Sequence, residues 1–345
     1  MRHYLLVLSI VFVGPLSALS KPSRQTEVSA SQAIGVATYS YFDEVRRRQI
    51  AVEFWYPASK DSRLLSQKGE EVWVHPHEVR NAPFAKTAYH LPLIVMSHGH
   101  GGDRRDRSWL AEKLVQNGFV VASLDHQGNT WKTMNIVATL KFWERPQDVS
   151  FAIDCLLKDP RLQDRFNPDQ IGFVGYSLAG LTGLALAGGV AEELEAEIHR
   201  NKVHFPELTP EILSGVDLAP AKRSYYDQRI KAVFLMAPAT WCFCKPNALS
   251  ALKTPLGIVA TESDEVLAFK EHMEPLINRS IPVRLKLLRN GETHFVFLNR
   301  VTEKGKKFLG ERVFFDPPGV DRKKIHQEIA SFAVEFFNQF LNHSQ

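Results

Sequence analysis

The six residues GYSLAG at 175–180 constrain the fold of this chain more than any other segment. They follow 170–174, which has the pattern of a short buried strand, and precede 181–187, an apolar stretch of small residues typical of a helix. A serine between a strand and a helix, among neighbours with little side chain, is typical of a sharp, strained turn that exposes its hydroxyl. Ser177 is therefore the candidate nucleophile. Ala179 stands where a second glycine is usual, which is a mild departure.

Strand and helix patterns alternate along most of the chain, which indicates an α/β fold with a mostly parallel sheet covered on both faces. We predict a single domain over 21–345, opened by an antiparallel strand pair, with a polar, turn-rich loop at 61–90. The other strands are expected at 91–96, 119–124, 230–236, 256–260 and 283–288, and the other helices at 107–117, 146–158 and 325–341.

The interval 188–228 interrupts this alternation. Residues 191–200 have the composition of a charged helix, and Thr209 followed by Pro210 is typical of a helix cap and first turn. An insertion at this point of such a fold lies above the carboxyl ends of the strands. We therefore predict a helical cap over the pocket, with a peripheral position as the alternative.

A serine hydroxyl is a weak nucleophile at neutral pH, so it needs a base, and the base needs a partner that fixes its tautomer. In a fold with a serine at such a turn, the chain order is serine, acid, histidine. His294 follows the last expected strand and is the predicted base. His272 and His326 lie on expected helices and suit packing or surface roles better, and His343 lies in the tail.

The acid is expected after the strand 256–260, where the chain reads TESDE. This loop offers three carboxylates, Glu262, Asp264 and Glu265, and spacing alone does not choose among them. We take Asp264 as the partner of the base, with Glu262 as the alternative.

Acyl transfer also needs N–H donors for the oxyanion of the tetrahedral intermediate, and loss of one donor lowers the rate by about 10²–10³. One donor is the backbone N–H of Leu178, the residue after the nucleophile. The second comes from the loop after an earlier strand, and SHGHGG at 97–102 fits that need because its glycines allow close backbone approach. We expect the His100 N–H to be this donor, with Gly99 as the alternative.

The same loop supports a rival interpretation, because HGHGGD at 98–103 is similar to the histidine-rich motif of metallo-hydrolases, with Asp125 and His126 able to complete a site. The spacing departs from that motif: the aspartate comes one residue late, and Arg104 stands where another histidine is expected. We therefore predict no metal and no other cofactor.

Several segments in order resemble an α/β-hydrolase of the platelet-activating-factor acetylhydrolase and "predicted dienelactone hydrolase" group. The matching segments are SHGHGG at 97–102, DHQGNT at 125–130, ERPQDV at 144–149, the turn at 175–180, ATESD at 260–264, THFVFL at 293–298 and DRKKIH at 321–326. The resemblance implies the α/β-hydrolase fold, Asp264 as the acid, His294 as the base and His100 as the second oxyanion donor. It departs from the family at Tyr176, Ala179 and His100, which stand for a histidine, a glycine and an apolar residue.

The resulting prediction is a serine carboxylic ester hydrolase that acts through an acyl-enzyme. The resemblance implies short-chain or phospholipid-type esters, and hence transient contact with a membrane surface. True dienelactone hydrolases use a cysteine where this chain has Ser177, so that label says little about the substrate. The alternatives are a lipase or polyesterase with a wider acyl pocket, an amidase, and a non-catalytic relative that binds a ligand.

The first twenty residues have a cationic start, an apolar run too short to span a bilayer, and small residues near Ser20. These features predict a signal peptide cleaved after Ser20 and an exported protein, periplasmic or secreted, with an uncleaved anchor as the alternative.

The formal net charge is +4, and the basic residues are scattered without stacking aromatics, so nucleic acid is not an expected partner. Three cysteines permit one disulfide in an exported protein. Because Cys242 and Cys244 are too close for a relaxed bridge, the expected pair joins Cys155 to one of them.

Overall fold

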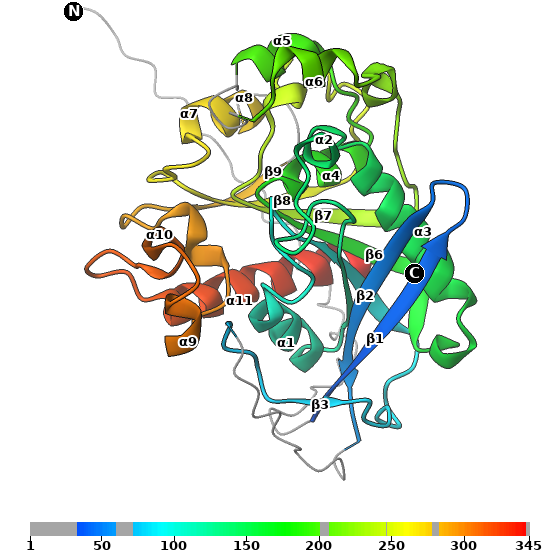
Figure 1. Ribbon diagram of the computed structural model, residues 1–345. Helices are drawn as coiled ribbons and strands as arrows, with labels where there is room; N and C mark the ends of the chain where they lie inside the picture. The colour runs from blue at the N-terminus through cyan, green and yellow to red at the C-terminus, as the bar shows by residue number, and fades with distance from the viewer. Residues whose placement is uncertain (1–32, 60–71, 201–206, 246, 278–282, 343–345) are drawn as a thin grey trace, which may run out of the picture.

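The computed structural model describes residues 33–59, 72–200, 207–245, 247–277 and 283–342 (Figure 1). The signal peptide predicted for residues 1–20 lies outside them. One sheet has the strand order β3-β1-β2-β5-β4-β6-β7-β8-β9. Its strands are β1 (Ile34–Asp43), β2 (Arg48–Pro57), β3 (Glu78–Arg80), β4 (Leu91–Ser97), β5 (Val120–Leu124), β6 (Phe166–Tyr176), β7 (Ile230–Met236), β8 (Leu256–Thr261) and β9 (Val283–Leu288).

The sheet is mixed but mostly parallel, as the alternation of patterns predicts. Strands β5, β4, β6, β7, β8 and β9 are parallel to one another. The expected opening pair is present, because β2 runs antiparallel to both β1 and β5. Strand β3 pairs in parallel with β1 inside the interval expected to be a loop. Its three residues are too few to produce a recognisable alternation of polar and apolar side chains.

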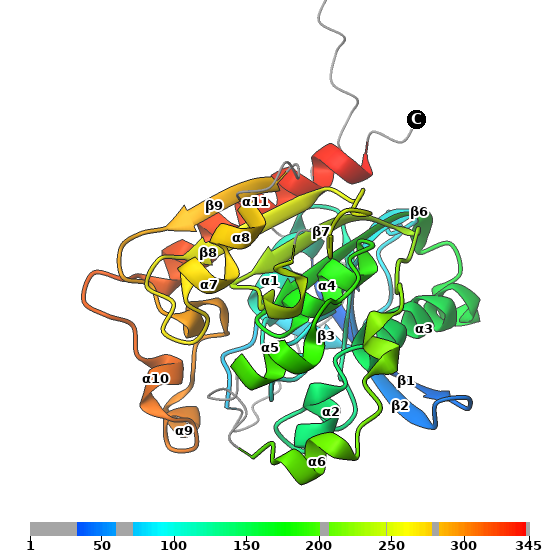
Figure 2. The same ribbon diagram turned by 90° about the horizontal axis from the view of Figure 1, so that it is seen from above.

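Helices cover both faces of the sheet (Figures 1 and 2). Helices α1 (Ser108–Gln116) and α11 (Arg322–Leu341) contribute to one apolar core layer, while α3 (Glu144–Lys158) and α4 (Ala179–Leu186) contribute to the other. Central strands are therefore apolar on both sides, and all of β5 is buried.

The interval 188–228 contains the two helices that its composition predicts. They are α5 (Leu194–Arg200) and α6 (Pro210–Ser214). The Thr209 hydroxyl accepts the N–H of Ile212 at 3.3 Å, which is the expected N-cap. Both views place α6 beside α2 (Ile136–Leu140), a short helix that the sequence pattern does not reveal (Figures 1 and 2).

All three cysteines are free thiols, so the disulfide expected between Cys155 and Cys242 or Cys244 is wrong. Cys155 lies on α3, whereas Cys242 is fully buried in the apolar core as a small hydrophobic side chain. The Cys244 sulfur lies 3.4 Å from the Thr240 hydroxyl. The number of cysteines in the sequence does not predict that each one lies in different surroundings.

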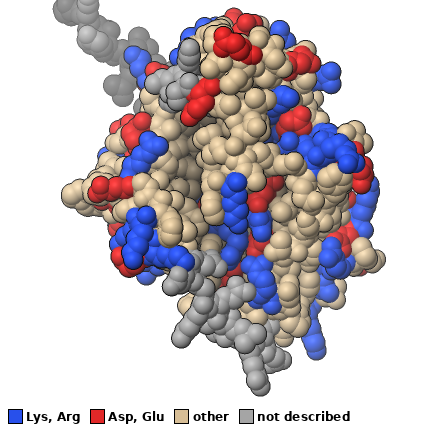
Figure 3. All heavy atoms as spheres, viewed as in Figure 1, with Lys and Arg blue, Asp and Glu red and all other residues tan. Residues whose placement is uncertain are grey.

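The surface shown in Figure 3 carries interspersed basic and acidic side chains, without a broad field of one sign. This distribution agrees with the scattered basic residues of the sequence. None of the helices in the described part of the chain combines the length and the hydropathy needed to cross a membrane.

Candidate active site

Ser177 occupies the turn between β6 and α4. Its φ is 53°, in the left-handed region that residues other than glycine rarely adopt. Hydrogen bonds hold the turn on both sides, since the Ser177 N–H donates to the Met236 carbonyl at 3.0 Å and the Ala239 N–H donates to the Ser177 carbonyl at 2.9 Å. The strained turn predicted from the sequence is therefore present.

The glycine pattern around the turn has a steric reason. A Cβ at Gly180 would lie 2.5 Å from both the Ala239 carbonyl oxygen and the Pro238 Cβ, and a Cβ at Gly175 would lie 2.5 Å from the carbonyl oxygen of Ala179. Ala179 itself is fully buried, and its methyl group is accommodated. The close approach to the loop after β7 thus falls on Gly180, one residue beyond the usual position.

Ser177, His294 and Asp264 come together in the required order. His294 Nε2 lies 2.9 Å from Ser177 Oγ, and His294 Nδ1 lies 2.7 Å from Asp264 Oδ2. The other oxygen of Asp264 accepts the backbone N–H groups of Val266 and Leu267 at 2.9 and 2.6 Å. The turn after β8 therefore fixes the Asp264 carboxylate so that one oxygen faces the imidazole.

The other two carboxylates of this loop have different partners. Glu262 is exposed and pairs with Arg289 at 2.8 Å. Glu265 Oε2 accepts the backbone N–H of His294 at 2.9 Å. Asp264 is thus the carboxylate that reaches the ring, while Glu265 anchors the backbone of the same histidine. Spacing in the sequence gave no sign of this second role.

The remaining histidines considered from the sequence make packing contacts. His272 is buried, and its Nδ1 accepts the backbone N–H of Thr240 at 3.2 Å. His326 stacks on Trp109 with ring centroids 3.9 Å apart. His343 lies outside the described residues.

Tyr176 is a part of the site that the sequence shows only as a departure from the family. Its hydroxyl donates to the His294 carbonyl at 3.0 Å. Burial raises the pKa of Tyr176 well above its ordinary value, so the hydroxyl keeps its proton. The Arg107 guanidinium lies 5.2 Å from the ring centroid and pairs with Asp106 at 2.7 Å. Tyr176 therefore links the backbone of the base to a buried ion pair.

The loop at 97–102 approaches the nucleophile closely. A Cβ at Gly99 would lie 3.1 Å from the Ser177 Cβ, which is tighter than an ordinary van der Waals contact, so a larger residue there would require its neighbours to shift. Within the described residues, neither the His100 N–H nor the Leu178 N–H donates to a backbone carbonyl. Neither predicted oxyanion donor is thus used in the backbone hydrogen bonds of the turn or of the loop.

The insertion lies close to this loop. Burial lowers the pKa of the His100 imidazole and Arg145 adds to that effect, while the Glu207 carboxylate of the insertion opposes it. An electrostatic effect of this kind requires proximity. That 188–228 forms a cap over the pocket stays a prediction.

The residues of the rival metallo-hydrolase interpretation are engaged in protein contacts. His98 Nε2 accepts the backbone N–H of His126 at 3.1 Å, and the His126 ring lies between Ser97 and the Asp148 carboxylate. Asp125 forms an ion pair with Arg104. Among the described residues, no three histidine, cysteine or carboxylate side chains are grouped to hold a metal ion.

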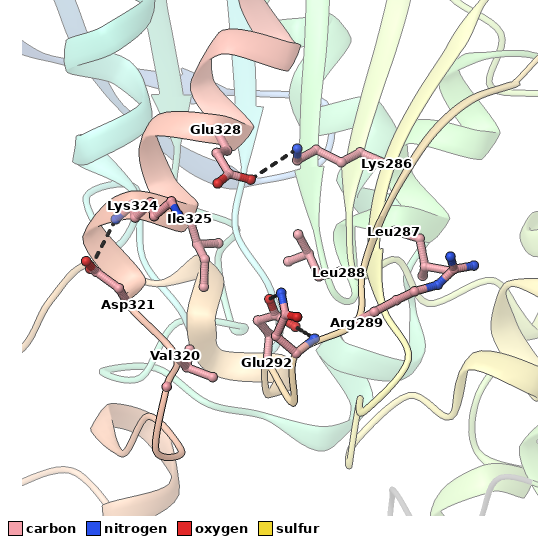
Figure 4. A pocket seen from close by; sticks show the side chains of 12 residues that line it. Lys286, Leu287, Leu288, Arg289, Glu292, Val320, Asp321, Lys324, Ile325 and Glu328 are labelled. Atoms are coloured by element: carbon pink, nitrogen blue, oxygen red, sulfur yellow. Dashed lines mark hydrogen bonds and ion pairs between the residues drawn. The ribbon is translucent and has the colours of Figure 1, made fainter.

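A separate hollow of about 230 Å³ lies between the end of β9 and the start of α11 (Figure 4). Several of its charged side chains already have partners, such as Lys286 with Glu328 at 3.3 Å and Arg289 with Glu262 at 2.8 Å. None of the residues of the Ser177 site lines this hollow.

Comparison with known proteins shows similarity to ester hydrolases. Residues 71–149 match the family model of platelet-activating factor acetylhydrolase, isoform II. A segment of 132 residues is 27% identical to cutinase est1 of Thermobifida alba, and it covers 36% of this chain and 41% of the cutinase. The match thus spans less than half of that relative.

The whole fold is similar to that of a ferulic acid esterase from Streptomyces cinnamoneus, with a TM-score of 0.56 and 18% identity over 92% of this chain and 94% of that one. The chain thus has the α/β-hydrolase fold around Ser177, and over the segment that contains the 97–102 loop it is similar to the platelet-activating factor acetylhydrolase family.

Proposed function

We propose that this protein is a serine carboxylic ester hydrolase that acts through an acyl-enzyme. The observation that carries the proposal is the pair of contacts at His294: 2.9 Å from its Nε2 to Ser177 Oγ and 2.7 Å from its Nδ1 to Asp264 Oδ2. Since an ionised aspartate only accepts hydrogen bonds, Nδ1 carries the proton, and Nε2 is left to accept the serine proton.

In the proposed mechanism, the Ser177 oxygen attacks the ester carbonyl while His294 takes the hydroxyl proton. The N–H groups of Leu178 and His100 stabilise the oxyanion of the tetrahedral intermediate. The intermediate collapses to the acyl-enzyme, and the imidazolium returns its proton to the leaving alcohol. Water then attacks the acyl group with His294 as base, and the acid and the free serine are released.

The substrates we propose are esters with short acyl chains, including phospholipid-type esters like platelet-activating factor, presented in solution or at a membrane surface. The match of residues 71–149 to the acetylhydrolase family supports this choice. A series of p-nitrophenyl esters is expected to show kcat/KM falling as the acyl chain lengthens. A clear preference for long chains contradicts the proposal.

A lipase or polyesterase with a wider acyl pocket is the second candidate. It is favoured by the similarity of one segment to a cutinase. The two candidates share the mechanism and differ in the space around the acyl chain. Turnover of emulsified triglyceride or of a polymeric ester above that of short soluble esters favours the second.

Labelling with a fluorophosphonate probe tests the mechanism. The folded protein is expected to be labelled at Ser177, and Ser177→Ala is expected to lose labelling and to lower kcat by about 10⁴-fold or more. Ser331→Ala is the matched control, because this serine is exposed on α11 and its hydroxyl donates to the Gln327 carbonyl of the same helix at 3.0 Å. Absence of labelling in the folded wild-type protein indicates a relative that binds a ligand without catalysis.

Export is the remaining part of the proposal. It is supported by the cationic start and short apolar run of residues 1–20. Sequencing of the amino terminus of protein recovered from outside the cytoplasm is expected to begin at Lys21. Full-length protein retained with the membrane indicates an uncleaved anchor.

A further inference from the structure

A buried hydrogen-bond chain lies behind the loop that approaches the nucleophile. Ser97 Oγ is 2.8 Å from His126 Nε2, and His126 Nδ1 is 2.9 Å from Asp148 Oδ2. All three residues are fully buried. This hydrogen-bond chain has the same residue types as the catalytic site, but it is closed to solvent and cannot contact a substrate. It can act only by fixing the position of the residues that it binds.

The direction of each hydrogen bond in this chain is fixed. The Asp148 carboxylate accepts from the Arg46 and Arg48 guanidinium groups at 2.7 to 2.8 Å, so it also accepts from His126 Nδ1–H. Burial, reinforced by neighbouring guanidinium groups, holds the pKa of His126 well below its ordinary value, and the ring is neutral. His126 Nε2 is therefore an acceptor, and the Ser97 hydroxyl donates to it.

Arg145 joins this chain to the loop. Its side chain is 1% exposed, and one nitrogen donates both to Ser97 Oγ at 3.2 Å and to the backbone carbonyl of His98. A second nitrogen donates to Asn129 Oδ1 at 2.7 Å. A buried guanidinium with these partners is a rigid fork, because moving it would leave several buried acceptors without donors.

The His98 side chain completes the connection to the next peptide. Its Nε2 accepts the His126 N–H at 3.1 Å, so its Nδ1–H donates to the Gly99 carbonyl at 2.7 Å. The Gly99–His100 peptide is trans, and in a trans peptide the C=O and N–H bonds point in opposite directions. Holding the Gly99 carbonyl on one side therefore aims the His100 N–H to the other side.

We infer that Arg145, His98 and the Ser97–His126–Asp148 chain are positioning residues that orient the His100 N–H as an oxyanion donor. The inference rests on the proposed esterase function. These residues touch no reacting atom. They fix the backbone of a loop that approaches Ser177 so closely at Gly99 that a Cβ there would lie 3.1 Å from the Ser177 Cβ. Pre-set donors of this kind act on the transition state more than on the bound substrate.

Three substitutions test the inference. His98→Leu removes the donor to the Gly99 carbonyl and is expected to lower kcat by about 10²-fold, with KM changed by less than about threefold. His98→Asn restores a donor near the Nδ1 position and is expected to recover at least about tenfold of that loss. Ser97→Ala is expected to lower kcat by about tenfold, because it breaks the chain one step further away.

Ser123→Ala is the matched control for Ser97→Ala. Ser123 is equally buried on the neighbouring strand β5, and its hydroxyl has no hydrogen-bond partner in the part of the chain that the structure describes. The kcat of Ser123→Ala is expected to match that of the wild type. A fall in kcat as large as that of Ser97→Ala indicates that any buried serine there matters only for packing, and contradicts the inference.

Inhibition by a trifluoromethyl ketone separates positioning from general stability. This inhibitor forms a tetrahedral adduct with an oxyanion, so its inhibition constant is expected to rise across the variants by the same factor as kcat/KM falls. If the variants unfold more easily but keep wild-type kcat and inhibition, the network only stabilises the fold and the inference is wrong.

Amide hydrogen exchange over 97–102 distinguishes failure of this inference from failure of the proposed function. Faster exchange in this loop is expected for His98→Leu and Ser97→Ala whether or not esters are turned over. A wild-type protein that neither cleaves esters nor labels at Ser177 contradicts the proposed function. Unchanged exchange in both variants contradicts the positioning role.

Discussion

The backbone at Ser177 lies in a conformation that costs a residue with a side chain of order 1–3 kcal/mol. Such a conformation persists only where the surroundings over-determine it, and here the hydrogen bonds to Met236 and Ala239 do so on both sides. The same turn brings the hydroxyl to His294 Nε2. Each residue of the site is therefore held in place by hydrogen bonds to residues other than Ser177, Asp264 and His294.

Replacement of the acid tests the assignment of Asp264. Asp264→Asn leaves a side chain that can donate to Nδ1 and so favours the wrong tautomer of His294, with an expected fall in kcat of about 10³–10⁴-fold. Glu262→Gln is the control for the alternative carboxylate and is expected to stay within about twofold of the wild type. Steady-state kinetics on a short-chain ester checks both, and the reverse ranking identifies Glu262 as the acid.

Tyr176→Phe removes only the hydroxyl that donates to the His294 carbonyl. The buried carbonyl then lacks its donor, so the free energy of unfolding is expected to fall by about 1–3 kcal/mol, measured by urea denaturation. The freed His294 backbone is expected to lower kcat by about tenfold.

Tyr56→Phe is the matched control, because it removes the same kind of hydrogen bond away from the site. The Tyr56 hydroxyl donates to the Ala82 carbonyl at 2.6 Å at the other side of the sheet. It is expected to lose similar stability and keep its kcat. Equal loss of kcat in both variants means that Tyr176 has no specific role in placing the base.

At the scale of elements, the sequence predicts the site because strand ends and functional residues coincide. The nucleophile, acid and base are predicted from their positions after the expected strands 170–174, 256–260 and 283–288, and these strands are present as β6, β8 and β9. Parallel strands carry such residues to one edge of the sheet, so the order of strand and helix patterns in the sequence is enough to predict which residues come together.

What the sequence could not predict depends on contacts between distant residues. Tyr176 and His294 are 118 residues apart, and no local pattern encodes their hydrogen bond. The same holds for Glu265: by spacing it is equivalent to the other two carboxylates of its loop, and only the folded structure brings it to the His294 amide. Strand β3 is formed by pairing with β1, and three residues carry no periodicity of their own.

Gly180→Ala tests the packing of α4 against the loop after β7. The new methyl group would lie 2.5 Å from the Ala239 carbonyl oxygen, so one of the two segments has to shift. We expect a loss of about 1–3 kcal/mol in the free energy of unfolding and a lower kcat, because Ser177 lies on the displaced turn. Urea denaturation and ester kinetics check both effects.

Gly215→Ala serves as its control. At this glycine a Cβ would meet its nearest neighbour, the Ile212 carbonyl oxygen, at an ordinary contact distance of 3.5 Å. The change in stability is expected to stay within about 0.5 kcal/mol. Equal stability of both variants shows that the backbone at Gly180 adapts more freely than the fold indicates.

At the scale of the whole molecule, several buried groups tie stability to pH. Burial lowers the pKa of His75 and His326 to about 3 and holds the pKa of His98 and His126 well below their ordinary value. In the unfolded chain these imidazoles titrate near about pH 6.5. Their contribution is therefore complete above that pH and is lost as the pH falls, because only the unfolded chain binds the protons.

Asp106 has the opposite effect. Burial raises its pKa to about 7 in the folded protein, so its contribution is present at low pH and is lost as the pH rises toward 7. Burial raises the pKa of Glu78 and Asp125 in the same direction and lowers that of His100, so five imidazoles oppose three carboxyls. We expect the free energy of unfolding to rise from about pH 5 to about pH 7, by about 1.4 kcal/mol per pH unit for each net proton, and the urea midpoint to rise with it. A midpoint that falls over this range contradicts the buried neutral state of these histidines.

The three free thiols have a consequence for how the protein can be made. No covalent cross-link has to form before the sheet and its helix layers are complete, so the folding of the chain does not depend on an oxidant. Cys242 is fully buried, which protects its thiol from reagents in solution while the fold is intact. Production of the folded enzyme therefore needs neither an oxidising compartment nor a disulfide isomerase, and thiol reductants can be kept in every buffer.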